Sequence, residues 1–343
     1  MHYPGLTSKW TELEVRESVM DYIEEMQKKT EFKLSYFLTH LSLSKSKYYD
    51  WKERTGIENK HNGKIPKEHW HTPEEEEKII SYVKKHIYST DRFYRDGYRR
   101  LAYRMLDEEI AALSPSSLYR ILKTNNLLSP WNTKKSTSKG KGFKQPKRVH
   151  RHWHIDIKYV HFCHRHYFLI SIIDGYSRFI VNHGLFEDMK TETITTLVQE
   201  AKDKFKGVNP RIISDNGPQF ISKEFSKFID FIQFTHARTS VGYPQSNGKI
   251  ERFHGTFNRE FYKHVPLLSF EDAKIKINEY IEHYNSERLH SALYYLTPLD
   301  FLLNKVDEKL HIRELKLKNA KELRSNYWQN NKQNSVVVST VLD

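Results

Sequence analysis

A chain of 343 residues with 38% hydrophobic content is long enough for two or three domains, each with its own core. Apolar runs fall well short of the roughly 20 residues that span a bilayer, and the start, MHYPGLTSKWTELE, lacks the order of a signal peptide. We therefore expect neither a membrane segment nor a leader. One cysteine, Cys163, excludes an internal disulfide framework and a Cys-rich zinc site, which favours a reducing, cytoplasmic compartment.

The net charge of +13 predicts a polyanionic partner. Much of this excess lies in residues 131–151, which contain eight basic and no acidic side chains. A surface that is basic only for solubility does not predict such a concentration. The distribution therefore indicates a nucleic acid.

Residues 1–57 are expected to form a first helical domain. TELEVRESVMDYIEEMQKK has mostly helical apolar spacing, and KLSYFLTHL and SKSKYYDWKER follow, the last with Ser44 as its N-cap. A short helix, a turn and a basic, aromatic helix are typical of a helix-turn-helix, and an ordinary small bundle has the same periodicity. Both interpretations stay open at this point. Residues 58–72 are polar and predict a linker.

Residues 73–130 predict a second helix-turn-helix domain. Thr72 and Pro73 start a helix whose first turn is acidic, and GYRRLAYRML and SPSSLYRILKTNNLL supply two more helices, the last capped by Ser114. Its candidate DNA contacts are Arg99, Arg100, Ser116, Ser117, Arg120 and Lys123.

Residues 131–151 predict a basic linker, because they are rich in Lys, Ser and Gly and poor in apolar residues. A solvated spacer is one interpretation. The lack of any acid from Leu128 to Ile155 favours contact with DNA phosphates. The candidate contacts are Lys134, Lys135, Lys139, Lys141 and Lys144.

In residues 152–303 the hydrophobic pattern is at first typical of β-strands. Three strands in a meander come first, and helices then alternate with two short strands, in the order βββαβαβα. This order predicts an α/β domain of ribonuclease H-like architecture, a mixed sheet with flanking helices. Five histidines near its start are expected at polar strand and hairpin positions: His152, His154, His161, His164 and His166. Residues 304–343 are a tail without an assigned role.

Three acids in this region carry the chemical argument. Asp156 lies in a strand, Asp215 follows RIIS, and Glu251 opens a helix after a gap of 35 residues. Each alone has an ordinary explanation: an exposed strand position, a turn, a helix surface. Together, each is expected at the end of an element around one sheet. Three clustered carboxylates repel without cations, so we expect divalent metals.

Several segments resemble a known family. WHIDIKY, SDNGPQF and YPQSNGKIE resemble the catalytic core of the retroviral-integrase superfamily. SKSKYYDWKER, RDGYRRLAYRM, SSLYRILKTNNLL and YNSERLHSALYYLTP are similar to bacterial insertion-sequence transposases with such a core. The resemblance covers roughly residues 30–303 and is highly specific.

The resemblance implies a DDE polynucleotidyl transferase that binds terminal inverted repeats and carries out strand cleavage and strand transfer. Two Mg²⁺ or Mn²⁺ ions are implied, one held by Asp156 and Asp215 and the other by Asp156 and Glu251. The implied partners are double-stranded DNA, at the element ends and at the target, and further copies of the chain, at least as a dimer on DNA. The implied location is the bacterial cytoplasm, at the nucleoid.

Two features depart from the family pattern. Cys163 alone cannot supply the zinc module of retroviral integrases, and Asn258 stands where many relatives have a lysine. Lys249, Gln245 and Asn216 are therefore the candidate DNA contacts of the core. The rival hypotheses are a non-catalytic sequence-specific DNA-binding regulator, which the three acids disfavour, and a metal-dependent nuclease, which the spacing and the PQSNG loop disfavour.

Overall fold

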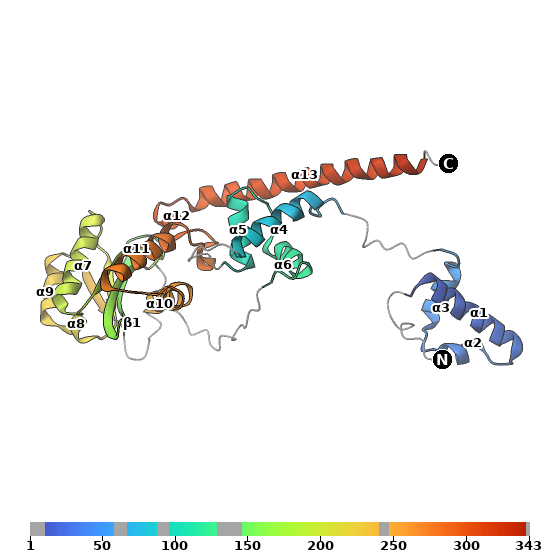
Figure 1. Ribbon diagram of the computed structural model, residues 1–343, viewed down its shortest axis with the longest axis horizontal. Coiled ribbons are helices and arrows are strands. Elements are labelled where there is room, and N and C mark those ends of the chain that lie inside the picture. Colours follow the sequence, from blue (N-terminus) through green and yellow to red (C-terminus); the bar gives the residue numbers. More distant parts are fainter. Residues whose placement is uncertain (1–10, 58–66, 88–95, 129–145, 240–246, 341–343) are drawn as a thin grey trace. The chain divides into compact units, whose positions relative to one another are not determined.

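The computed structural model describes residues 11–57, 67–87, 96–128, 146–239 and 247–340 (Figure 1). The chain divides into two compact units, Met1–Trp70 and His71–Asp343. No helix in these described ranges is long and apolar enough to cross a membrane.

The first unit contains three helices in its described part: α1 (Leu13–Lys29), α2 (Leu34–His40) and α3 (Lys45–Glu53). Ser44 caps α3 as expected, and its hydroxyl accepts a hydrogen bond from the Lys47 amide at 3.3 Å. The helices enclose a small core that includes Ile23 and Trp51. The three helices lie where the sequence pattern and the Ser44 cap predicted them.

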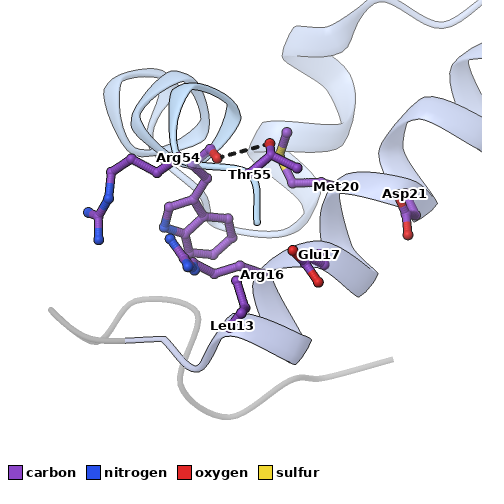
Figure 2. Close-up of a pocket in the computed structure, with 8 residues that line it drawn as sticks. Leu13, Arg16, Glu17, Met20, Asp21, Arg54 and Thr55 are labelled. Carbon is purple, nitrogen blue, oxygen red and sulfur yellow. Dashed lines mark hydrogen bonds between the residues drawn. The ribbon is translucent and has the colours of Figure 1, made fainter. Parts of the chain in front are cut away.

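A pocket between α1 and the end of α3 is shown in Figure 2. The Arg16 side chain at this pocket is buried, and its Nη2 donates to the Ile57 carbonyl at 2.6 Å. On the same helix, Glu17 accepts from the Gly56 amide at 3.1 Å, where φ of +74° suits glycine. These contacts fasten the segment after α3 to α1, which indicates a structural role for the pocket residues.

The second unit begins with three more helices, α4 (Pro73–Ile87), α5 (Tyr98–Asp107) and α6 (Pro115–Thr124). Thr72 and Glu75 form a reciprocal capping box at the start of α4, and Ser114 caps α6. These caps follow the expectation from sequence. The buried side chains of the three helices pack on one another and include Ile79, Met105 and Leu118.

The rest of this unit is built on a five-stranded sheet in its described part, in the order β3-β2-β1-β4-β5. Strands β1, β2 and β3 are antiparallel neighbours, whereas β4 is parallel to both β1 and β5. This mixed sheet with flanking helices is the ribonuclease H-like architecture, which confirms the expected fold class. The strands are β1 (His152–Phe162), β2 (Arg165–Asp174), β3 (Ile180–Phe186), β4 (Arg211–Ser214) and β5 (Thr235–Arg238).

Helices cover both faces of the sheet, and β1 alternates between them. Trp153 and Ile155 face α7 (Thr191–Lys204), α8 (Pro218–Ile221) and α9 (Lys223–Phe231). Val160 and Phe162 face α10 (Gly248–Phe257) and α11 (Phe270–Ser286). Helix α10 continues without a break into a π-helical turn, η2 (Asn258–Tyr262).

The segment after α11 leads back to the three helices α4, α5 and α6, which are called the second helical unit or the small helical unit below. A 3-10 turn, η3 (Ser291–Leu293), and a short helix, α12 (Pro298–Leu302), lead into α13 (Val306–Thr340). Helix α13 contacts α5 and runs past the helices α4 to α6 (Figure 1). The stretch that sequence left as a tail is thus mostly one long helix, part of which packs on the rest of the unit.

Candidate active site

Asp156 and Asp215 belong to the two neighbouring strands at the centre of the sheet. The parallel register pairs His154 of β1 with Ile213 of β4. This is the last pair of the β1–β4 register, and Asp156 and Asp215 each come two residues later in the same direction, at the same end of the paired segment. Asp215 directly follows the end of β4, as expected. Asp156 lies inside β1 rather than at a strand end, because β1 runs on to Phe162 to pair with β2.

Glu251 lies in the first turn of α10, on the side of the sheet to which Asp156 points. One turn later on the same helix, His254 Nδ1 lies 3.4 Å from Asp156 Oδ2. Residues three apart on a helix are neighbours on its surface, so Glu251 is adjacent to the residue that contacts Asp156. Helix α10 thus brings the third acid to the same edge of the sheet.

Each acid has a different exposure. The Asp156 side chain is 19% exposed, whereas Asp215 and Glu251 are exposed. Their carboxylate oxygens are the hard ligands that Mg²⁺ and Mn²⁺ prefer. Within the described ranges, however, no group of three or more His, Cys, Asp or Glu side chains is gathered closely enough to hold a metal ion. The donor types therefore suit a metal, and the three side chains are not drawn together in this conformation.

The loop after β4 is fixed by short contacts. Asp215 Oδ1 accepts from the Gly217 amide at 2.9 Å, and Asn216 Nδ2 donates to the Thr239 carbonyl at 2.8 Å. A Cβ at Gly217 would lie 3.1 Å from Asp215 Oδ1 and 2.5 Å from the Gln219 side-chain nitrogen. Glycine lets the loop close on the aspartate. The Asn216 amide, a candidate DNA contact, is used within the protein.

Lys249 lies in the first turn of α10, two residues before Glu251. Lys249 is half-buried, and burial together with the charge of Arg178 lowers its pKa to about 7, against an opposing effect of Asp174. Its Nζ has no hydrogen-bond partner among the described residues. Burial, aided by Lys249, lowers the pKa of His154 to about 3, so that this imidazole is neutral at pH 7. His154 is buried, which corrects the expected polar strand position.

The candidate DNA contacts of the second helical unit fall into two groups. Ser116, Arg120 and Lys123 are exposed on α6, and Ser117 is half-buried beside its cap. Arg99 is also exposed and lies over the Tyr98 ring. Arg100 differs, because its guanidinium forms ion pairs with Asp96 at 3.0 Å and Glu260 at 3.2 Å. This geometry favours a role for Arg100 within the protein rather than on DNA.

Six further candidates lie outside the described residues: Lys134, Lys135, Lys139, Lys141, Lys144 and Gln245.

Sequence reasoning missed two residues around the acids. His254 contacts Asp156, and its spacing of three from Glu251 on a helix was a signal that could have identified it. Glu260 is buried in η2 between Arg100 and Arg288, and no local pattern marked it.

Comparison with known families identifies the central region. One family model, described as an integrase core domain, matches residues 146–244, and a second with the same description matches residues 232–298. The two matches cover the sheet and the helices α7 to α11, so they include all three acids.

Similar proteins of known sequence come from mobile elements. A putative integrase of Spiroplasma virus SpV1-C74 is 31% identical over 40% of this chain and 42% of its own length. An uncharacterized 39.2 kDa protein of insertion element IS476 from Xanthomonas euvesicatoria is 25% identical over 61% of each chain. The transposase of insertion sequence element IS904 from Lactococcus lactis is 28% identical over 43% of this chain and 60% of its own length. The chain thus spans less than two thirds of each of these relatives.

Solved structures with some likeness include retroviral integrases. An intasome chain of simian T-cell lymphotropic virus is 17% identical over 64% of this chain and 73% of that chain, with a TM-score of 0.42. The catalytic core of HTLV-2 integrase in complex with magnesium is 19% identical over 45% of this chain and 97% of that chain, with a TM-score of 0.37.

Proposed function

We propose that this chain, whose residues 146–298 form an integrase core domain, is the DNA transposase of an insertion sequence. In this proposal it binds the terminal inverted repeats, cuts a strand at the end of the element and joins that strand to another DNA. The observation that supports the proposal is that Asp156 and Asp215 each come two residues after the last pair of the parallel strands β1 and β4, while His254, on the helix of Glu251, lies 3.4 Å from Asp156.

The three acids are proposed as metal ligands. Asp156 with Asp215, and Asp156 with Glu251, would each hold a divalent ion, Mg²⁺ or Mn²⁺. Two metal ions held in this way would activate a water or a 3′-hydroxyl and would stabilise both the attacking and the leaving oxygen of a phosphodiester. The Gly217 amide orients Asp215 through its hydrogen bond, and His254 Nδ1 lies 3.4 Å from Asp156 Oδ2, where it can position that carboxylate. Glu251 must turn its exposed side chain toward the aspartates to complete the set.

The remaining candidates are proposed as DNA contacts. On α6, Arg120 and Lys123 are exposed with Ser116, as side chains that reach DNA must be. In the core, the unpaired Nζ of Lys249 would gain a partner from a phosphate, and its pKa would rise in that contact. The lysines of residues 131–151 would add contacts that depend steeply on salt. Joining two DNA ends further suggests at least two copies of the chain on DNA.

The substitution Asp215→Asn tests the site. It keeps the shape of the side chain and removes the charge that a metal needs, so strand cleavage and joining in Mg²⁺ should be lost while end-specific binding persists. The assay incubates the protein with a duplex that contains the DNA flanking its gene and maps nicked and joined strands. Asp230→Asn on α9, also an exposed aspartate, is the matched control and should keep full activity.

The products separate the rival functions. Joined strands support a transposase, whereas nicked strands without joining, at any site, indicate a nuclease. Retained joining by the Asp215→Asn protein would contradict the assignment of the metal ligands. Binding by the unaltered protein without cleavage in either Mg²⁺ or Mn²⁺ would favour a non-catalytic regulator.

A further inference from the structure

Glu260 joins the helix of the candidate active site to a different part of the second unit. It lies in η2, the π-helical turn that continues α10, nine residues after Glu251. Its side chain is buried. Oε2 accepts from Arg288 Nε at 2.6 Å, and Oε1 accepts from Arg288 Nη2 at 2.8 Å. Oε1 also accepts from Nη2 of Arg100, a residue of α5, at 3.2 Å.

This three-residue bridge is charged in the folded chain. Burial by itself would raise the pKa of the Glu260 carboxyl, but the hydrogen bonds and charges of Arg288 and Arg100 outweigh it and hold the pKa below its ordinary value. Burial likewise opposes the charge of Arg288, and the bonds to Glu260 more than compensate, so its pKa is raised. The bridge is therefore an ion pair at neutral pH, with Arg100 as its second cation.

A second link runs through α13. Arg313 donates to both carboxylate oxygens of Asp107, at the end of α5, at 2.8 and 2.6 Å. The same guanidinium donates to the backbone carbonyls of Tyr294 and Tyr295 at 2.9 and 2.7 Å. The Tyr295 ring stacks on Tyr103 of α5 with centroids 4.4 Å apart. One arginine thus holds α13, α5 and the segment after α11 together.

A third link reaches α4. Arg324 of α13 donates to both carboxylate oxygens of Glu75 at distances of 2.8 to 3.1 Å, and to the Ala112 carbonyl at 2.6 Å. Together, the three links attach α5 to the core and attach both α4 and α5 to α13. Bidentate arginine–carboxylate pairs are directional, so they restrict orientation as well as distance.

We propose that Arg100, Glu260 and Arg313 are positioning residues that hold α4–α6 at a fixed separation from the Asp156–Asp215 edge. The DNA sequence bound by α6 would then lie at a fixed distance from the candidate active site, so that the core cuts the DNA at one phosphodiester. This inference rests on the proposed function, because it assumes that α6 binds the DNA that the core cuts. It assigns to these residues the choice of the cleavage position and no part in the reaction itself.

The test variant is Arg100→Gln combined with Arg313→Gln. Glu260 keeps both bonds to Arg288, so the core retains its buried pair while two links to the small helical unit are lost. Lys78→Gln is the control, because Lys78 is an exposed cation of α4 and belongs to none of these links. Nicks are mapped at nucleotide resolution in Mg²⁺ on an end-labelled duplex that contains the DNA flanking the gene, and binding is measured by titration.

The unaltered protein should nick one phosphodiester. The double variant should bind with similar affinity, nick that position at least about 10-fold more slowly, and spread the remaining nicks over neighbouring phosphodiesters, since misplacement by about 1 Å can cost about 100-fold in rate. Lys78→Gln should leave the nick at one position, at the rate of the unaltered protein. Arg100→Lys, which keeps one bond to Glu260, should narrow the spread seen with Arg100→Gln alone.

Each other outcome has a defined meaning. Absence of nicking by the unaltered protein refutes the proposed function. Nicking by the double variant at one unchanged position, whether at full or reduced rate, overturns the positioning role and leaves these bridges a part in stability alone. If the double variant does not fold, Arg100→Gln decides in the same way, because it leaves the Arg288 and Arg313 contacts in place.

Discussion

The two small helical units of this chain have similar local construction and different attachments. Each has three helices in its described part, and in each the third helix starts at a serine cap, Ser44 or Ser114. In the first, the buried Arg16 bonds to Ile57 of the same unit. In the second, arginines and acids bond to the core and to α13. The same three-helix pattern can therefore form a separate compact unit or pack against the region that matches the integrase core models.

The attachment of the second helical unit depends on charged side chains in addition to its apolar core. Met105 and Leu118 already supply its core. Asp107 and Glu75 lie at the ends of α5 and α4, where they are 35% and 26% exposed and each takes a bidentate bond from α13. Hydrophobic burial forms the unit, and directional ion pairs set its orientation.

Cavities in the cores of the two helical units should have the largest effects, and they test whether the two units are attached differently. Met105→Ala and Ile23→Ala each remove a fully buried side chain and should each cost about 2–5 kcal/mol in the free energy of unfolding. Hydrogen exchange followed peptide by peptide should show that Met105→Ala loosens α5 and also α13. Ile23→Ala should loosen the peptides of α1–α3 alone. If the hydrogen-exchange protection of α13 were equal in both variants, the stability of α13 would not depend on the core of α4–α6.

Loss of the Arg324 links should have a smaller effect. Arg324→Ala leaves the Glu75 carboxylate and the Ala112 carbonyl without this donor, which should cost about 1–3 kcal/mol. Lys321→Ala, an exposed residue of α13 one turn earlier, is the control and should change little. Urea unfolding measures both. If Arg324→Ala lowers the free energy of unfolding no more than the control does, the Arg324 bonds do not stabilise the contact between α13 and α4.

Acid pH should weaken the same link gradually. Burial opposes ionisation of Glu75, but bonds from His71, Arg324 and the Thr72 amide outweigh it and lower its pKa from 4.5 to about 2. A carboxyl whose pKa falls on folding stabilises the fold above its unfolded pKa. This contribution should therefore be lost as the pH falls from about 5 to about 2. Unfolding by urea along this range should be less pH-dependent in Glu75→Gln than in the unaltered chain.

The control for this measurement is Glu76→Gln, the exposed neighbour of Glu75 in the same helical turn. It should leave the acid branch of the stability curve unchanged. The same slope in the Glu75→Gln protein and the unaltered chain would mean that the Glu75–Arg324 pair does not persist in solution.

Much of the fold followed from local patterns. Helix caps at Ser44, Thr72 and Ser114 were predicted because a hydroxyl that satisfies a free amide leaves a local signature. The order of strands and helices predicted the mixed sheet, since connections between successive elements restrict topology. The position of Asp215 at the end of β4 followed from the same pattern.

Other features needed contacts between distant residues. Arg100 looked like any basic residue of a DNA-binding helix, yet its partner Glu260 lies 160 residues away along the chain. The burial of Lys249 and His154 likewise depends on how α10 meets β1 and the segment around Asp174. Sequence spacing could not supply these environments, because local propensity carries no information about which side chains converge.

The sequence by itself determined most helices before residue 304, the succession of strands along the chain, the basic stretch at 131–151 and the three acids in their order. Tertiary structure alone decided that β1 and β4 are parallel neighbours, that Arg100 turns toward Glu260, and that the helix of residues 306–340 bonds to the second helical unit. The physical reason is range. Caps, turns and periodicity act within a few residues, whereas register and buried ion pairs arise only when separate elements meet.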